Sequence, residues 1–116
     1  MKSLLKLRRS TVLTHYNVII QEAARLDILA IIDYILEDFQ EPVIASKYFS
    51  AIMKEIQSLQ TLPKRTRVLN DEPYRTKGYR VTYVKNYAVF YRVLDSISEV
   101  HIMRVLYNRR DWRNIL

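Results

Sequence analysis

The hydrophobic period of this chain changes once, and that change constrains its fold more than any other feature. Between residues 22 and 59 apolar side chains recur every three or four positions, as on the buried side of an amphipathic helix. Between residues 79 and 106 β-branched and aromatic residues dominate with a period of two, which is typical of strands. The sequence therefore predicts one α+β domain in which helices pack on a sheet.

The helical region divides into two helices. The first is expected over Glu22–Phe39, and the second begins at Pro42, because proline fits the first turn of a helix. Pro63 is expected to end the second helix. The break at residues 40–41 is short, so the two helices should form an antiparallel hairpin.

The strand region predicts three strands at Tyr79–Val84, Tyr87–Leu94 and 99–106, joined by two short turns. Strands joined in this way form an antiparallel meander. The β-branched run at 16–20 predicts a fourth strand in the same antiparallel sheet, with the helical hairpin packed on one face. The segment 63–78 lacks a period and is expected to be a mostly exposed loop.

Composition excludes several classes of site. The chain has no cysteine, so disulfides and thiolate metal sites are excluded, and this usage is compatible with a cytoplasmic location. It has one glycine, whereas glycine-rich phosphate loops and dinucleotide fingerprints need several. Its two histidines, His15 and His101, are far apart. We therefore expect no metal and no cofactor, and no apolar run is long enough to cross a membrane.

Charge is unevenly distributed along the chain. Residues 1–15 carry a net charge of +4, residues 16–62 carry −4, and residues 63–116 carry +7. A basic and Tyr-rich surface suits a polyanion, because neutralised phosphates release counterions and bases stack on aromatic rings. We therefore expect the C-terminal half to carry the functional surface.

The candidate functional residues are mainly arginines of this half. If the helices cover one face of the sheet, Arg80, Arg92 and Arg104 could converge on the other face, where they would hold phosphates and stabilise a charged transition state. Strict alternation puts Arg104 on the side of Val100 and Ile102. The alternative is that these arginines are solvated or paired with nearby carboxylates.

The segment after the last strand offers the best candidates for target contact. Arg109 and Arg110 are adjacent cations that seldom serve a core, and Trp112 is expected to anchor the tail to the body. RNA cleavage would also need groups that transfer protons. His101, a tyrosine or Glu99 could serve, although a packed or hydrogen-bonded role for His101 is the simpler interpretation. No convincing acid–base pair is present.

The order of these elements resembles the RelE/ParE superfamily of toxins from type II toxin–antitoxin modules. The most specific part is the run RVLYNRRDW at residues 104–112, which is similar to the superfamily's closing pattern R-[VI]-L-[HY]-x-x-R-D. The run YAVFYRV at residues 87–93 supports it. The resemblance covers residues 16–112, so we expect a single toxin domain over 16–116 after a basic N-terminal extension at 1–15.

This resemblance implies a toxin that arrests growth, is neutralised by a cognate antitoxin, and with it binds operator DNA. ParE-like members poison DNA gyrase, whereas RelE-like members cleave mRNA on the ribosome. The RelE pattern is only partly present, because Thr82 and Ala88 stand where basic residues are expected and Ile115 lies near an expected tyrosine. We therefore favour gyrase inhibition, as in plasmid stabilisation systems.

Two alternatives remain open. One is an mRNA interferase (a ribosome-dependent endoribonuclease), and the other is a non-toxic remnant of the fold that binds nucleic acid. The net charge of +7 predicts an acidic, partly disordered tail on the antitoxin. The expected site residues are Arg80, Arg92 and Arg109 for catalysis, and Arg104, Tyr107, Arg109, Arg110 and Trp112 for target or nucleic-acid contact.

Overall fold

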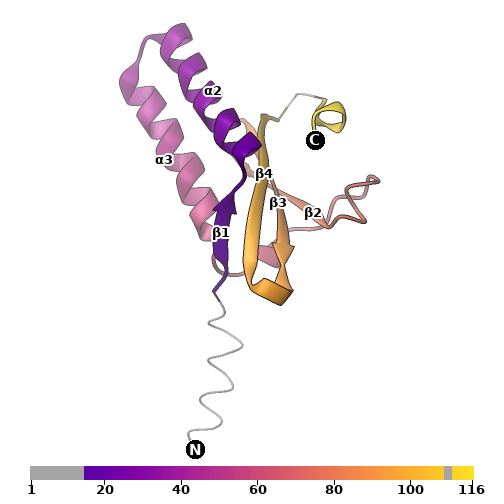
Figure 1. Cartoon of the computed structure of the whole chain (residues 1–116). Coiled ribbons are helices and arrows are strands. Elements are labelled where there is room, and N and C mark those ends of the chain that lie inside the picture. Colours follow the sequence, from indigo (N-terminus) through magenta and orange to yellow (C-terminus); the bar gives the residue numbers. More distant parts are fainter. Residues whose placement is uncertain (1–14, 109–110) are drawn as a thin grey trace, which may run out of the picture.

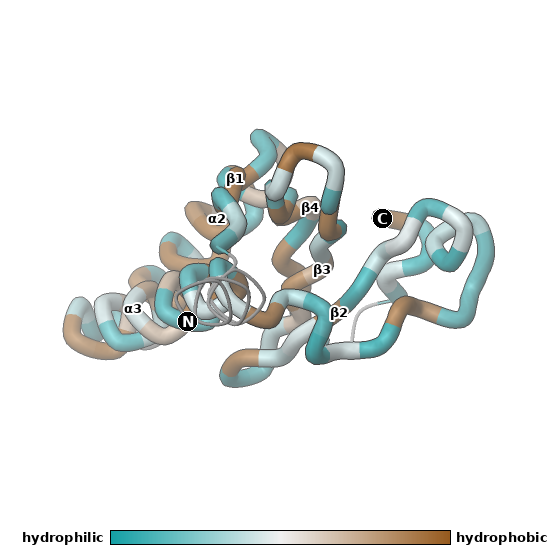
Figure 2. The backbone as a smooth tube through the Cα atoms, turned by 90° about the horizontal axis from the view of Figure 1, so that it is seen from below, coloured by the Kyte–Doolittle hydropathy of each residue, from teal (hydrophilic) through white to brown (hydrophobic). Residues whose placement is uncertain are grey.

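The computed structural model describes residues 15–108 and 111–116. A helical layer, a four-stranded sheet, and a layer made of a loop and the C-terminal tail lie side by side (Figure 1). Figure 2 shows the same three layers from below, with the hydrophilic loop that leads into β2 on the side away from the helices. In chain order the main elements are β1 (Asn17–Ile20), α2 (Glu22–Phe39), α3 (Pro42–Ser58), β2 (Tyr79–Val84), β3 (Tyr87–Leu94) and β4 (Glu99–Tyr107), with single 3-10 turns at Pro63–Arg65, Asp95–Ile97 and Trp112–Asn114.

Both expected helices and all four expected strands are present, so the α+β class is confirmed. Helix α2 ends at Phe39, and the next residue, Gln40, takes a left-handed backbone with φ of 49°. Helix α3 begins at Pro42 as expected but ends at Ser58, well before Pro63. The chain then turns through Leu62, which also takes a left-handed conformation, with φ of 51°. In the described part of the chain, no helix is long and apolar enough to cross a membrane.

The strand order is β1-β4-β3-β2. Strands β2, β3 and β4 form the expected antiparallel meander, but β1 pairs in parallel with β4, with Asn17 opposite Glu99 and Ile20 opposite Ile102. The expectation of a wholly antiparallel sheet is therefore wrong for β1. The hairpin explains this pairing, because α3 returns the chain to the end of the sheet where β1 began. Strands β2 and β4 consequently run in the direction of β1.

The helices cover one face of the sheet and form the main core with it. Burying such side chains stabilises the fold by about 1.5–3 kcal/mol for each large aliphatic residue. This core contains Ala24, Ile28, Ile31 and Ile35 of α2, Ala45, Ile52 and Ile56 of α3, Leu59 after it, and Tyr87, Val89, Tyr91, Val100, Ile102 and Val105 of the sheet.

The opposite face of the sheet carries a second, smaller core. Tyr74 from the loop before β2 is buried there, and Trp112 from the tail packs against Phe90 and Tyr74 with ring centroids 5.3 and 5.7 Å apart. Most of segment 63–78 is exposed, as expected. Together with the tail, however, this segment covers part of the face that we expected to be an open cationic surface.

A β-bulge in β4 changes which residues share a face. Phe90 lies opposite Arg104 while the next residue, Tyr91, lies opposite Ile102, so Met103 is an extra residue. An extra residue reverses the alternation beyond it. The expected placement of Arg104 with Ile102 is therefore wrong.

Candidate functional site

Arg80 lies on the side of β2 that the helices cover. Its neighbour Thr82 points the same way, is buried, and donates its hydroxyl to Glu55 Oε2 of α3 at 2.6 Å. The Arg80 guanidinium donates to the carbonyl oxygens of Lys64 and Thr66. Arg80 therefore fastens the loop after α3 to the edge of the sheet.

Arg92 points to the opposite face, where its Nε donates to the carbonyl oxygen of Lys77 at 2.8 Å. The register explains why the two arginines are separated. Arg92 pairs with Tyr79, whereas Arg80 pairs with Tyr91, and because neighbouring residues of a strand point to opposite faces, Arg80 and Arg92 do so too. The expected convergence of Arg80 and Arg92 on one face is therefore wrong. Any chemistry that needs both guanidinium groups on one substrate is not supported by this arrangement.

Arg104 forms a bidentate ion pair with Asp27 of α2. Its Nε and Nη2 donate to Asp27 Oδ2 and Oδ1 of α2 at 2.7 and 2.8 Å, and its Nη1 donates to the carbonyl oxygen of Ile115 at 3.1 Å. Asp27 Oδ2 also accepts the amide of Val105 at 2.9 Å. The Asp27 carboxylate raises the pKa of Arg104. Arg104 thus joins α2, β4 and the tail, and its expected role in target contact stays a prediction.

His101 is held at both ring nitrogens. Its Nε2 lies 2.7 Å from Glu99 Oε1, and its Nδ1 lies 3.1 Å from Gln21 Nε2. A general base needs one nitrogen free to take a proton from the substrate. The arrangement therefore agrees with the hydrogen-bonded interpretation of His101 and not with that of a general base.

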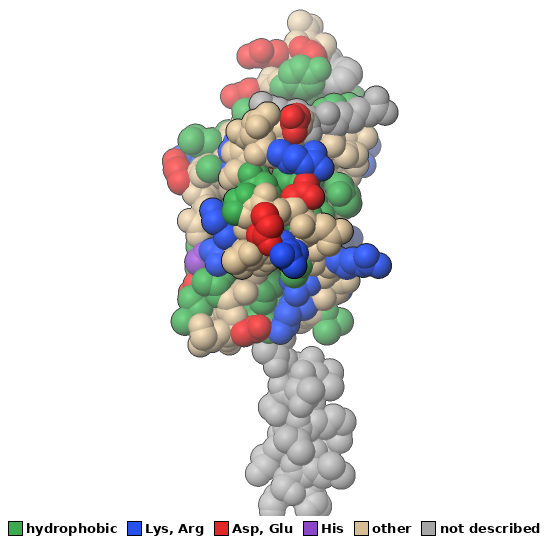
Figure 3. All heavy atoms as spheres, turned by 90° about the vertical axis from the view of Figure 1, so that its right-hand side faces the viewer, with side chains coloured by type: hydrophobic (Ala, Val, Ile, Leu, Met, Phe, Trp, Pro, Cys, Tyr) green, Lys and Arg blue, Asp and Glu red, His purple; other side chains and the backbone are tan. Residues whose placement is uncertain are grey.

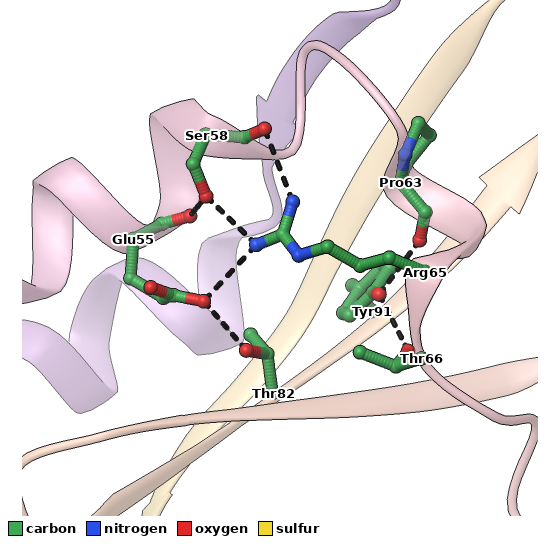
Figure 4. Close-up of polar contacts among 7 residues, drawn as sticks. All are labelled: Glu55, Ser58, Pro63, Arg65, Thr66, Thr82 and Tyr91. Carbon is green, nitrogen blue, oxygen red and sulfur yellow. Dashed lines mark hydrogen bonds and ion pairs between the residues drawn. The ribbon is translucent and has the colours of Figure 1, made fainter.

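A polar cluster between α3, the following loop and the sheet was not found from the sequence (Figure 4). Glu55 accepts hydrogen bonds from Thr82 and from Arg65 Nη2, the latter at 3.1 Å, and Arg65 also donates to the hydroxyl and carbonyl oxygens of Ser58. The only signal in the sequence is that Glu55 directly precedes the buried Ile56 in α3. The cluster fixes the end of α3 over β2.

The hydroxyl of Tyr91 completes this cluster beneath the loop. It donates to the carbonyl oxygen of Pro63 and shares a second hydrogen bond with the hydroxyl of Thr66, both at 2.7 Å. Burial raises the pKa of Tyr91. A phenol that is buried and bonded in this way holds the loop in place.

The tail residue Trp112 is an anchor, as expected. Besides its contacts with Phe90 and Tyr74, it lies under the guanidinium of Arg113, 4.8 Å from the ring centre, and Arg113 pairs with Asp71 of the loop at 2.6 Å. Asn108 directly precedes the expected target-contact residues in the chain, and its amide donates to the carbonyl oxygen of Asn86 at 2.8 Å. Arg109 and Arg110 themselves lie outside the described residues.

Charges of both signs alternate over the face that carries the loop and the tail (Figure 3). Two ion pairs account for part of this pattern, Arg75 with Glu72 at 2.7 Å and Arg113 with Asp71 at 2.6 Å. The expectation of one concave cationic surface is therefore not met by the described residues.

A pocket of about 470 Å³ opens on the other side of the sheet, between α2 and the adjoining ends of β3 and β4. Tyr107, expected to contact the target, lies at this pocket and packs edge-on against Tyr87 at 5.9 Å. Tyr34 of α2 is also exposed here, and a hydrogen bond to Asp38 raises its pKa. The lining residues are Asp27, Ala30, Ile31, Tyr34, Tyr87, Val105, Leu106 and Tyr107.

A helical hairpin on a four-stranded sheet, closed by an anchored C-terminal tail, defines a small α+β fold. Two solved structures share it: the chromosomal ParDE toxin–antitoxin system of P. aeruginosa (TM-score 0.66, 21% identity, covering 81% of this chain and 97% of that one) and the toxin–antitoxin complex RelBE2 of Mycobacterium tuberculosis (TM-score 0.60, 22% identity, covering 81% and 92%). No relative was found among curated proteins.

The family model for the ParE toxin of the type II toxin–antitoxin system parDE matches residues 18–112. The chain therefore belongs to the ParE toxin family, within the RelE/ParE superfamily that the sequence resembles.

Proposed function

We propose that this protein arrests growth by inhibiting DNA gyrase and that a cognate antitoxin neutralises it. The observation that carries this proposal is the separation of the strand arginines, since Arg80 and Arg92 point to opposite faces and Arg104 is paired with Asp27. An RNA-cleaving site needs cations and proton-transfer groups around one phosphate. A toxin that acts by binding a large enzyme needs only a contact surface.

The contact surface that we propose is the end of β4 and the start of the tail. Arg109 and Arg110 lie in the sequence between Asn108, which is hydrogen-bonded to the turn after β2, and Trp112, which is packed on the sheet. Tyr107 contributes an exposed aromatic ring beside them in the chain. Two arginines between two fixed residues suit an anionic or acidic target surface.

The partner that we propose is an antitoxin with an acidic, partly disordered tail, encoded beside this gene. Opposite charge would speed its association with a chain of net charge +7. The toxin–antitoxin pair would bind its own operator DNA, and the toxin would act in the cytoplasm.

Induction of the gene, followed by measurement of labelled precursor uptake, tests the proposal. We expect DNA-damage signalling and an early loss of DNA synthesis, and the purified chain should convert gyrase and supercoiled DNA into cleaved complexes. If protein synthesis stops first and primer extension finds cuts in transcripts, the gyrase proposal is refuted. Unchanged growth would instead favour the nucleic-acid-binding remnant.

The contact surface is tested by replacing Arg109 and Arg110 with Ala. We expect this double variant to lose toxicity while its circular dichroism is unchanged. The double variant R75A/K77A is a matched control, because it removes two exposed cations of the loop before β2. Equal toxicity of the two double variants would contradict the proposed surface.

RelE-like cleavage of mRNA is the second candidate, and one observation favours it. Arg80 and the Glu55–Arg65 pair both hold the loop after α3, so a carboxylate and two guanidinium groups border one short segment. In this candidate Arg80 and Arg109 would stabilise charge on the RNA, without Arg92, which lies on the opposite face of the sheet. Primer extension with the variant E55Q separates the candidates, because loss of transcript cuts with retained folding would support a nuclease.

A further inference from the structure

The pocket beside α2 combines an apolar lining with exposed aromatic rims. Ile31, Val105 and Leu106 form apolar parts of its lining, whereas Tyr34 and Tyr107 are 55% and 42% exposed. Contact between water and the exposed aromatic rings around this apolar hollow is unfavourable. An apolar side chain that enters the hollow would cover the rings and so gain free energy. The pocket is therefore suited to aliphatic side chains.

The hairpin side of this pocket is acidic, whereas Lys85, which lies over Tyr48 next to the lining residue Tyr87, is a cation on the β3 side. Inside it, Asp27 is neutralised by Arg104. Further along the hairpin, the exposed carboxylates of Asp33, Glu37, Asp38 and Glu41 form no ion pair with another described residue. An occupant should therefore carry positive charge next to its aliphatic side chains.

One segment of this chain has that chemistry. Residues 1–14 contain four Lys or Arg and no carboxylate, together with Leu4, Leu5, Leu7, Val12 and Leu13. This segment also lies outside residues 18–112, which the ParE toxin model matches.

The length of the segment is sufficient for it to reach the pocket of its own molecule. It joins the body at Tyr16, whose amide donates to the carbonyl of Gln60, beside the strand end where Asn17 lies opposite Glu99. The pocket lies at the other end of β4, roughly 27 Å away at about 3.4 Å per residue. An extended segment of this length spans up to roughly 46 Å.

We propose that residues 1–14 dock within the same molecule into the pocket beside α2, with their leucines over the apolar lining and their cations against the acidic hairpin. The segment is then an intramolecular occupant that competes with any partner for this surface. This inference concerns the purified chain alone, so it stands whether the target is gyrase or the ribosome.

Cysteine cross-linking tests the proposal directly, because the chain has no cysteine of its own. Leu5→Cys is combined either with Ala30→Cys, in the pocket, or with Ala23→Cys as the matched control. Ala23 and Ala30 are both exposed, and seven residues of helix separate them, so they lie on the same side of α2. Ala23 is nearer to the point where the segment joins the body.

We expect the disulfide from residue 5 to residue 30 to form about 10-fold faster than that to residue 23 at low protein concentration, because docking raises the local concentration at the pocket. An undocked tether would favour the nearer residue 23. Equal rates, a faster reaction at residue 23, or predominantly intermolecular products would each overturn the proposal.

A second measurement tests the role of charge. Replacing Lys2, Lys6, Arg8 and Arg9 with Gln should reduce the rate of disulfide formation with residue 30 to the rate with residue 23. Added salt should have the same effect. These positions precede residues 18–112, which the ParE toxin model matches, and we expect the circular dichroism of the variant to be unchanged. If neither change alters the rate of disulfide formation with residue 30, electrostatic docking of the segment is refuted.

Discussion

The ion pair between Asp27 and Arg104 should contribute more to stability than any other polar contact in the described residues. The replacement Asp27→Ala removes two hydrogen bonds from the Arg104 guanidinium and one from the Val105 amide. The Arg104 and Asp27 side chains are only 24% and 13% exposed, so solvent replaces these bonds poorly. The variant leaves the Arg104 guanidinium charged, with most of its N–H donors unpaired.

The size of this loss can be worked from the geometry. Removing one partner of a fully buried pair costs about 3–5 kcal/mol, and the partial exposure here favours the lower end of that range. We therefore expect the free energy of unfolding to fall by about 3 kcal/mol. For a chain of this size, such a loss lowers the Tm by about 10–15 °C.

Urea unfolding followed by circular dichroism and by the fluorescence of Trp112 measures this loss. A double-mutant cycle with Arg104→Ala should give a coupling free energy of about 1–2 kcal/mol. The control is Arg25→Ala, whose pair with Glu22 is 54% and 68% exposed and should therefore contribute little to the free energy of unfolding. A loss below about 1 kcal/mol for Asp27→Ala, or no coupling, would refute the reasoning.

Three further predictions follow from other contacts. Trp112→Ala removes the ring that packs on Phe90 and should cost about 2–3 kcal/mol in urea unfolding, and a loss of only a few tenths would show that the tail is not an anchor. Tyr91→Phe removes a buried hydroxyl with two hydrogen bonds and should cost about 1–2 kcal/mol, whereas an unchanged midpoint would contradict the bonding described. A hydrogen bond from Lys64 lowers the pKa of Asp95 below its ordinary 3.8, so Asp95 contributes stability above that pH and loses the contribution as pH falls through the lowered pKa. Asp95→Asn should therefore flatten the acid side of the stability profile, and an unaltered profile would argue against it.

Most element boundaries could be predicted because local pattern determines them, although α3 ends at Ser58 and not near Pro63. The helical period ends at the tight break before Pro42, and the strand period resumes directly after Gly78, whose φ of 76° suits a residue without a side chain. The short turn at residues 85–86 fixes the pairing of β2 with β3. These signals lie within a few residues of the structure that they specify.

The candidate site could not be predicted to the same degree, because it depends on distant residues. The extra residue Met103 reverses the alternation of β4, and no local signal distinguishes it from its neighbours. Asp27 resembles Asp33 in sequence, yet only Asp27 lies beside Arg104. The second core around Tyr74 could not be predicted either, because it forms only where the loop and the tail meet over the sheet.

The parallel pairing of β1 with β4 has a consequence for synthesis of the chain. The first strand made must wait for the last one, because the residues that pair with Asn17 and Ile20 are Glu99 and Ile102. Until β4 has left the ribosome, β1 lacks the one strand that neighbours it among the described residues, and Val18 and Ile20 lack partners such as Val100. Nascent chains that stop before β4 therefore expose apolar surface, which makes them substrates for proteases and chaperones. The sheet of this toxin is complete only once β4 has been translated.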